Sequence, residues 1–188
     1  MRNSPKATGL SFTCGVARRF IRAAITFINR RRTVFEPENS LEALMQAAGK
    51  DPVVAPTFYR ALLDTELYIL TPEVPVKPGQ RRSLKFQEKI NIASVEFQGM
   101  TWLPAFTSKK RISDYVKEPE TCLGAPARNL FEMLPKANFW LNPLSECQKP
   151  LPATEIALLM NGKIFETLRR SQSAHGVSFD KAQSDKLG

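Results

Sequence analysis

The spacing of hydrophobic residues predicts most of the elements of this chain. Apolar residues recur every three or four positions, as in amphipathic helices, in these segments: 41–48, 51–64, 109–117, 128–134 and 153–170. Short alternating or continuous apolar runs, as in strands, occupy these segments: 67–70, 84–98, 101–107 and 139–141. Because the two patterns alternate loosely around a long central hairpin, we expect an α+β fold, with a mixed or antiparallel sheet of about four or five strands and helices packed on it.

The run Thr101–Ser108 is the most apolar short stretch in the middle of the chain, and we expect it to contain the central strand. Gln98-Gly99 predicts the turn that joins this strand to the preceding one. Pro104 has no N–H to donate, so it must lie at a bulge or at an unpaired position of the sheet. Thr107-Ser108 is then expected to cap the next helix.

Turn and cap residues predict the other boundaries. Asn39 and Ser40 are the expected N-cap residues of the first helix, and Gly49 is its expected end. Gly124–Ala127 predicts a tight turn before a helix, and Gly162 is a candidate break in the last helix. Segment 144–152 is rich in proline and polar residues, which predicts a loop.

The net charge of +9 is concentrated at the N-terminus. Residues 1–33 contain no acidic residue and carry these basic side chains: Arg2, Lys6, Arg18, Arg19, Arg22, Arg30, Arg31 and Arg32. Since the remainder is close to neutral, the charge does not predict nucleic-acid binding by the body of the chain. We expect a basic N-terminal extension at 1–33, one domain at 34–170 and a disordered polar tail at 171–188.

Residues 15–32 place apolar side chains on one side and arginines on the other, which predicts a basic amphipathic helix. Its uncharged run is too short to span a bilayer. Three interpretations stay open at this point. The first is a helix that binds a membrane surface, a nucleic acid or a protein partner. The second is an organellar targeting peptide, and the third is an extension without a role.

Residue types that carry chemistry are sparse. The cysteines Cys14, Cys122 and Cys147 form no Cys-x-x-Cys pair, and the single histidine, His175, lies in the polar tail. We therefore expect no metal site, no histidine-based catalysis and a reducing compartment. The glycines are scattered, so neither a phosphate-binding loop nor a cofactor is expected.

Two stretches are candidates for binding. One is the loop after the strand at 139–141, which combines a strand end with prolines and a lysine: Asn142, Pro143, Cys147, Lys149 and Pro152. The other is a surface groove lined by aromatic and basic side chains: Arg60, Trp102, Phe106, Arg128 and Trp140. The alternatives are a rigid connector for the loop and core packing for the aromatic residues.

A series of short segments lies in a fixed order between about Phe35 and Leu159: Asn39–Glu42, Ala55–Leu63, Leu67–Leu70, Leu103–Ser108, Pro126–Glu132, Phe139–Pro143 and Lys149–Ile156. In order and spacing this series resembles the SseB N-terminal domain family, which is named for a phenotype of enhanced serine sensitivity. The resemblance implies an α+β domain in the bacterial cytoplasm and argues against an organellar presequence. The family has no established catalytic residues, so the resemblance implies no reaction.

The chain departs from the family pattern in several places, and the basic arm, which precedes the usual start of the domain, is the first. Members often have Pro-Phe-Phe where this chain has Pro104-Ala-Phe106, and a glycine where it has Gln148, so that a turn there would be less comfortable. Members also commonly have a second, C-terminal domain, which we expect to be missing here.

The hypothesis that follows is a non-catalytic interaction or regulatory module whose partner is another protein. One alternative is an enzyme or enzyme accessory in serine or sulfur amino-acid metabolism, with Arg60, Arg128, Cys147 and Lys149 as its candidate residues. That alternative depends on the family name alone. The other is association with membranes or nucleic acid through the basic arm, with peripheral membrane contact through residues 15–32.

Overall fold

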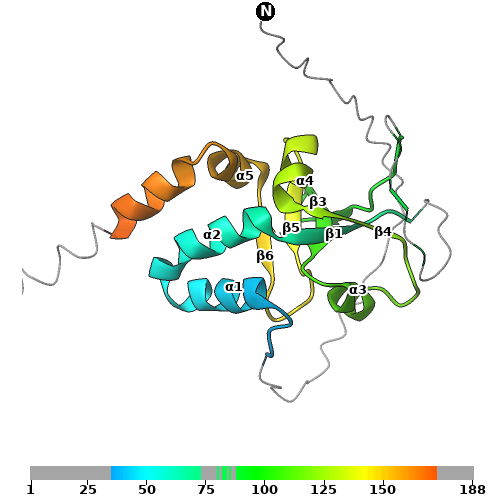
Figure 1. Ribbon diagram of the computed structural model, residues 1–188, viewed down its shortest axis with the longest axis horizontal. Coiled ribbons are helices and arrows are strands. Elements are labelled where there is room, and N and C mark those ends of the chain that lie inside the picture. Colours follow the sequence, from blue (N-terminus) through cyan, green and yellow to red (C-terminus); the bar gives the residue numbers. More distant parts are fainter. Residues whose placement is uncertain (1–34, 73–79, 81, 84, 86–87, 173–188) are drawn as a thin grey trace, which may run out of the picture.

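The computed structural model describes residues 35–72, 80, 82–83, 85 and 88–172 (Figure 1). The predicted basic helix, all of segment 1–33 and the tail from residue 173 lie outside this part of the chain. The described residues form, in order, α1 Ser40–Lys50, the 3₁₀ helix η1 Pro52–Val54, α2 Ala55–Asp64, β1 Glu66–Leu70, β2 Val95–Phe97, β3 Met100–Phe106, α3 Lys109–Tyr115, β4 Cys122–Pro126, α4 Ala127–Met133, β5 Asn138–Leu141, β6 Lys149–Leu151 and α5 Ala153–Met160. Residues 163–172 form a further helix.

The strands form one six-stranded sheet with β3 at its centre (Figure 1). The order is β4-β1-β3-β5-β6, and β2 pairs with β3 beyond the point where β1 stops. β3 and β5 run parallel, whereas the other pairs are antiparallel. This mixed sheet with packed helices confirms the expected α+β class and the central strand.

Pro104 lies between two ladders on one side of β3. β1 pairs with Ala105 and Phe106, and β2 pairs with the segment from Met100 to Trp102. On that side Pro104 therefore has no ladder partner, as its missing N–H requires. The predicted turn before β3 is confirmed as well, because Gln98 and Gly99 have φ angles of 52° and 74°, the two positive values of a type I′ hairpin.

Both predicted helix caps are confirmed. The side chain of Asn39 accepts a hydrogen bond from Glu42 N at the start of α1, and that of Ser108 accepts one from Arg111 N at the start of α3. α1 runs one residue past its predicted end at Gly49. Gly162, with a φ of 77°, separates α5 from the helix at 163–172, so the predicted break is present.

Two strands lie where the sequence predicts a turn and a loop. β4 occupies the predicted turn at Gly124–Ala127 and pairs along all of β1, and β6 lies inside the predicted loop at 144–152. Both are at edges of the sheet, where glycine and proline are tolerated because one side needs no ladder bonds. The expected strand at 84–98 is wrong over most of its described length, since only Val95–Phe97 pairs with β3.

Successive side chains of a strand point to opposite faces, so the register defines two faces of the sheet. The first face packs against α1, α2, α4 and α5 and forms the main core. Its strand residues are Leu67, Ile69, Leu103, Ala105, Phe139, Leu141 and Leu151. The helices add fully buried aromatic and aliphatic side chains, such as Phe58 and Phe131.

The second face is covered differently at its two ends. At the carboxyl end of β3, Phe106 and Leu70 pack with Ile112 of α3 in a smaller cluster. At the opposite end, β2 and the start of β3 carry Phe97 and Met100, which are among the exposed large apolar residues. The second face is therefore covered by α3 at one end and exposes apolar side chains at the hairpin end.

Candidate functional site

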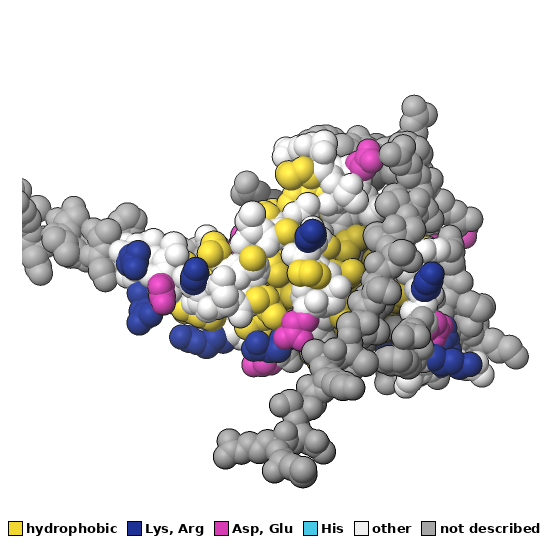
Figure 2. All heavy atoms as spheres, turned by 90° about the horizontal axis from the view of Figure 1, so that it is seen from above, with side chains coloured by type: hydrophobic (Ala, Val, Ile, Leu, Met, Phe, Trp, Pro, Cys, Tyr) yellow, Lys and Arg dark blue, Asp and Glu magenta, His cyan; other side chains and the backbone are white. Residues whose placement is uncertain are grey.

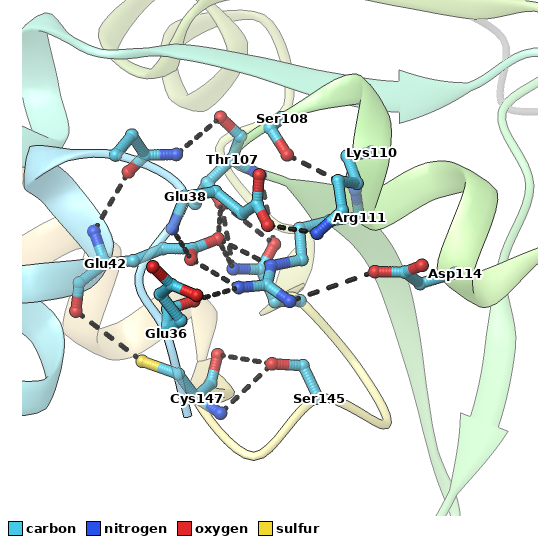
Figure 3. Close-up of polar contacts among 12 residues, drawn as sticks. Glu36, Glu38, Glu42, Thr107, Ser108, Lys110, Arg111, Asp114, Ser145 and Cys147 are labelled. Carbon is cyan, nitrogen blue, oxygen red and sulfur yellow. Dashed lines mark hydrogen bonds and ion pairs between the residues drawn. The ribbon is translucent and has the colours of Figure 1, made fainter. Parts of the chain in front are cut away.

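A cluster of buried polar side chains lies at the carboxyl ends of the parallel strands β3 and β5 (Figure 3). Thr107 directly follows β3, and Asn142 directly follows β5, where its N–H donates to Ala105 O at 2.8 Å. We call Glu42, Thr107, Arg111 and Asn142 the polar cluster. Ligands of open sheets commonly bind at the carboxyl ends of parallel strands, which makes this the first place to look for chemistry.

Glu42 is the centre of the polar cluster and is 0% exposed. It stands in the first turn of α1, three residues after the cap Asn39, in the position that a capping box gives to an acidic residue. Its Oε2 accepts from Glu38 N at 2.9 Å, and its Oε1 accepts from Asn142 Nδ2 at 3.0 Å and from the Thr107 hydroxyl. The helix start and both strand ends therefore meet on one carboxylate.

Arg111 of α3 closes the cluster from the outside (Figure 3). Its guanidinium donates to both oxygens of Glu42, from Nε at 2.9 Å and from Nη2 at 2.7 Å. It also lies 5.0 Å over the ring of Phe35 and donates to Glu36 O at 3.2 Å. The guanidinium is thus held by a ring over one face and by hydrogen bonds at its nitrogens, and the side chain of Arg111 is 12% exposed.

The electrostatics of the cluster favour a fixed ion pair. Burial alone would raise the pKa of Glu42, but hydrogen bonds from Arg111, Thr107 and Glu38 N outweigh it and leave that pKa below its usual value. The hydrogen bonds with Glu42 raise the pKa of Arg111 in turn. A carboxylate held this way stays ionised at neutral pH and is a poor general base.

Cys147 adjoins the polar cluster but is not activated by it. Its Sγ lies 3.7 Å from Glu42 O, and its side chain is buried. Burial, followed by the charge of Glu42, raises the pKa of the thiol to about 11, although Arg111 opposes this. The group is therefore a protonated thiol rather than a nucleophile. Among the described residues, no group of His, Cys, Asp and Glu side chains is placed to hold a metal ion.

A second candidate surface lies at the hairpin end of the sheet. Phe97 and Met100 are 45% and 46% exposed, and the ring of Phe97 lies 4.8 Å from that of Trp140. Trp102, which is buried, lies behind them at 6.1 Å from Trp140. We call Phe97, Met100 and Trp140 the aromatic patch. Hydrophobic side chains also gather on the face of the molecule that Figure 2 draws, where charged side chains lie mainly around them.

A family model, the SseB protein N-terminal domain, matches residues 41–158. The chain belongs to the SseB N-terminal domain family. It is 28% identical over 126 residues to Protein SseB of Escherichia coli (strain K12) and to Protein SseB of Shigella flexneri, which covers 66% of this chain and 47% of each relative. The chain thus spans about half the length of these curated relatives. No solved structure matches it.

The stretch that matches the SseB N-terminal domain contains both the polar cluster and the aromatic patch. The resemblance inferred from the ordered segments is therefore confirmed, and both surfaces belong to the family domain. In the part of the chain that is described, no helix has the length and apolar character needed to cross a membrane.

The predicted binding loop of this SseB domain is largely built into its body. Asn142 is 1% exposed, and Pro143 and Cys147 are buried too. Lys149 lies in β6 and pairs with Glu155 of α5 at 2.9 Å. Pro152 directly precedes α5. The loop resembles the rigid connector that was the alternative interpretation.

Positive φ angles in this loop fall elsewhere than the family pattern suggested. They occur at Asn142, with 45°, and at Leu144, with 64°, and not at Gln148. The side chain of Gln148 instead accepts a hydrogen bond from Leu144 N at 3.3 Å. The glutamine at this position therefore supports the turn.

The predicted surface groove does not form as one feature. Phe106 is 0% exposed because it packs with Ile112 of α3, and Trp102, beside Trp140, is 4% exposed, so the groove prediction is wrong for both. Arg60 lies 4.9 Å over the ring of Phe165, and Arg128 is exposed on α4. Of the five predicted groove residues, Trp140 alone belongs to the aromatic patch.

Sequence reasoning missed Glu42, Thr107 and Arg111 as a set. A partial signal exists, because Asn39 and Glu42 have the spacing of a capping box. The contacts of Glu42 with Thr107 and Arg111 span 65 and 69 residues. Such long-range pairing has no local pattern that a single sequence reveals.

Proposed function

We propose that this protein is a non-catalytic interaction module of the bacterial cytoplasm that binds another protein through its aromatic patch. The observation that carries the proposal is the exposure of Phe97 and Met100, at 45% and 46%, beside Trp140. Grouped apolar side chains that stay in water mark interaction sites, and aromatic residues supply most of the binding energy there.

The polar cluster supports the non-catalytic part of the proposal. The hydrogen-bond partners of Glu42 lie within the domain, and its ion pair with Arg111 makes this carboxylate a poor group for proton exchange with a substrate. Of the four candidate residues of the enzyme alternative, Arg60, Arg128 and Lys149 lie on three different elements, and Cys147 is buried with a raised pKa. The interaction hypothesis is therefore the one that the geometry favours.

Affinity capture with a patch variant and a matched control tests the proposal. Met100→Asp places a charge in the aromatic patch, whereas Val53→Asp places the same charge on η1, where Val53 is 64% exposed. Both sites are exposed, so both variants should keep the folded state, which far-UV circular dichroism and a urea midpoint verify.

The expected result is that proteins retained from a bacterial lysate by the wild type are lost with Met100→Asp and kept with Val53→Asp. An interface anchor lost to a charge weakens binding by about ten-fold or more, which quantitative mass spectrometry resolves easily. Equal recovery by all three chains would refute a role for the aromatic patch.

A further inference from the structure

We propose that the aromatic patch binds an uncharged, extended, proline-containing segment of its partner, and that a carbonyl of this segment accepts a hydrogen bond from the Trp140 indole. This inference rests on the proposed function and names the chemistry of the partner. Three properties of the patch point to it: an indole N–H without an acceptor, a neutral face and a movable edge.

The indole N–H of Trp140 has no hydrogen-bond partner among the described residues, although the atom is buried. A buried donor without an acceptor costs about 1–3 kcal/mol, so native structures seldom keep one. Trp102, by contrast, donates its indole N–H to Phe97 O at 3.3 Å. Of these two neighbouring indoles, Trp140 therefore has a donor to offer to an acceptor from outside.

The strand positions on the face around Trp140 carry no charged side chain. The register places these side chains on it: Val95, Phe97, Met100, Trp102, Pro104, Asn138, Trp140 and Pro150. A charged partner segment would lose its hydration here without gaining a counter-charge. Charge complementarity therefore selects an uncharged segment.

The conformation of the partner segment follows from the hydrogen bond that it must accept. The carbonyls within a helix are already bonded to its own N–H groups, whereas a polyproline II segment has no internal hydrogen bonds and keeps its carbonyls free. Proline rings also pack well on aromatic surfaces, and such a segment loses little conformational entropy on binding. An extended proline-containing segment therefore has free carbonyls, rings that pack on aromatic side chains and a small entropy loss on binding.

Phe97 is the exposed side chain that lies next to the Trp140 ring. Its ring lies 4.8 Å from that of Trp140, and it is 45% exposed at the end of β2, next to the hairpin turn. A bound segment can therefore displace this side chain and reach the N–H. Met100 is opposite Phe97 in the register, and its exposed side chain would contact the other side of the bound segment.

Titration of the full-length chain with a synthetic polyproline peptide, followed by ¹H–¹⁵N NMR, tests the inference. The indole resonance of Trp140, assigned by its loss in Trp140→Phe, should move downfield on gaining an acceptor, while that of Trp102 moves less. Trp140→Phe keeps an aromatic ring but lacks the N–H, and should weaken binding about five-fold. Trp102→Phe, with a preserved NMR fingerprint, should bind as the wild type does.

A glycine–serine peptide of equal length serves as the control and should not bind. If polyproline leaves both indoles unchanged while Met100→Asp still abolishes protein capture, the patch binds another chemistry, and this inference fails without the proposed function. If the wild type instead self-associates in sedimentation and Met100→Asp does not, a second copy occupies the patch and the inference fails too. Equal affinity of Trp140→Phe and wild type would also overturn it.

Discussion

Replacement of Arg111 by an uncharged residue should destabilise the domain more than replacement of Glu42, the carboxylate that it neutralises. Arg111→Met keeps most of the side-chain length but leaves Glu42, which is 0% exposed, as an uncompensated buried anion. Breaking a buried pair in this way costs about 3–5 kcal/mol. Because single domains are stable by only about 5–15 kcal/mol, the variant would lose a large share of its folding free energy.

Glu42→Gln provides the matched comparison. The glutamine keeps the shape and some of the hydrogen bonds with Thr107 and Asn142, and the freed guanidinium of Arg111 lies near the surface at 12% exposure. We therefore expect a smaller loss, of about 1–3 kcal/mol. Urea unfolding at neutral pH, followed by circular dichroism, measures both free-energy differences.

The pH dependence of the two chains separates this reasoning from a simple loss of packing. In the wild type the folded pKa of Glu42 is below its unfolded value, so its contribution is present above the unfolded pKa and is lost as the pH falls through the folded one. In Arg111→Met burial acts without the ion pair and should raise that pKa above the unfolded value.

The penalty of Arg111→Met should therefore shrink as the pH is lowered and Glu42 takes up a proton in the folded state. Glu42→Gln has no carboxyl group to protonate at this position. Its own free energy of unfolding should therefore gain nothing from this site as the pH is lowered from neutral. A penalty for Arg111→Met that is below that of Glu42→Gln, or that does not change with pH, would refute the account.

Three further changes probe the same structure. Asn142→Ala, at a φ of 45°, should cost about 2–4 kcal/mol in urea unfolding, and Asn142→Gly about 1 kcal/mol less because glycine accepts that φ; equal costs would contradict this. Gly124→Ala should cost about 1 kcal/mol, since a Cβ there would lie 2.8 Å from Glu66 Oε1 and 2.9 Å from the ring of Tyr68, and the cost should fall in a Tyr68→Ser background, where the rigid ring is gone and only the flexible Glu66 side chain has to move. Cys147 should resist alkylation in the folded chain at pH 8, as measured by peptide mapping, because burial raises its pKa to about 11; rapid labelling would argue against this burial.

Local signals along the chain predicted the elements whose formation depends on neighbours in sequence. The caps at Asn39 and Ser108, the Gln98-Gly99 turn and the central strand are all encoded within a few residues. β4 was missed because Gly124 and Pro126 read as a turn, although an edge strand tolerates both. The conformation of this segment is decided by its pairing with β1, which is a tertiary interaction between residues far apart in the sequence.

The candidate sites were less predictable for the same reason. Trp140 and Phe106 were both predicted to be surface aromatic residues, but Phe106 is buried under α3. Only the relative placement of helix and sheet distinguishes the two. The polar cluster likewise joins α1, the end of β3, α3 and the end of β5, and no one of its members is distinctive alone.

The tight turn at Gln98-Gly99 has a consequence for the order in which the sheet assembles. The β2–β3 hairpin brings together residues that are close in sequence, whereas β3 meets β5 across 36 residues. Closing the longer loop costs more chain entropy, so the hairpin should form early and present β3 as a template for β1 and β5. We expect Gly99→Val, which opposes a φ of 74°, to slow refolding more than it accelerates unfolding in stopped-flow experiments.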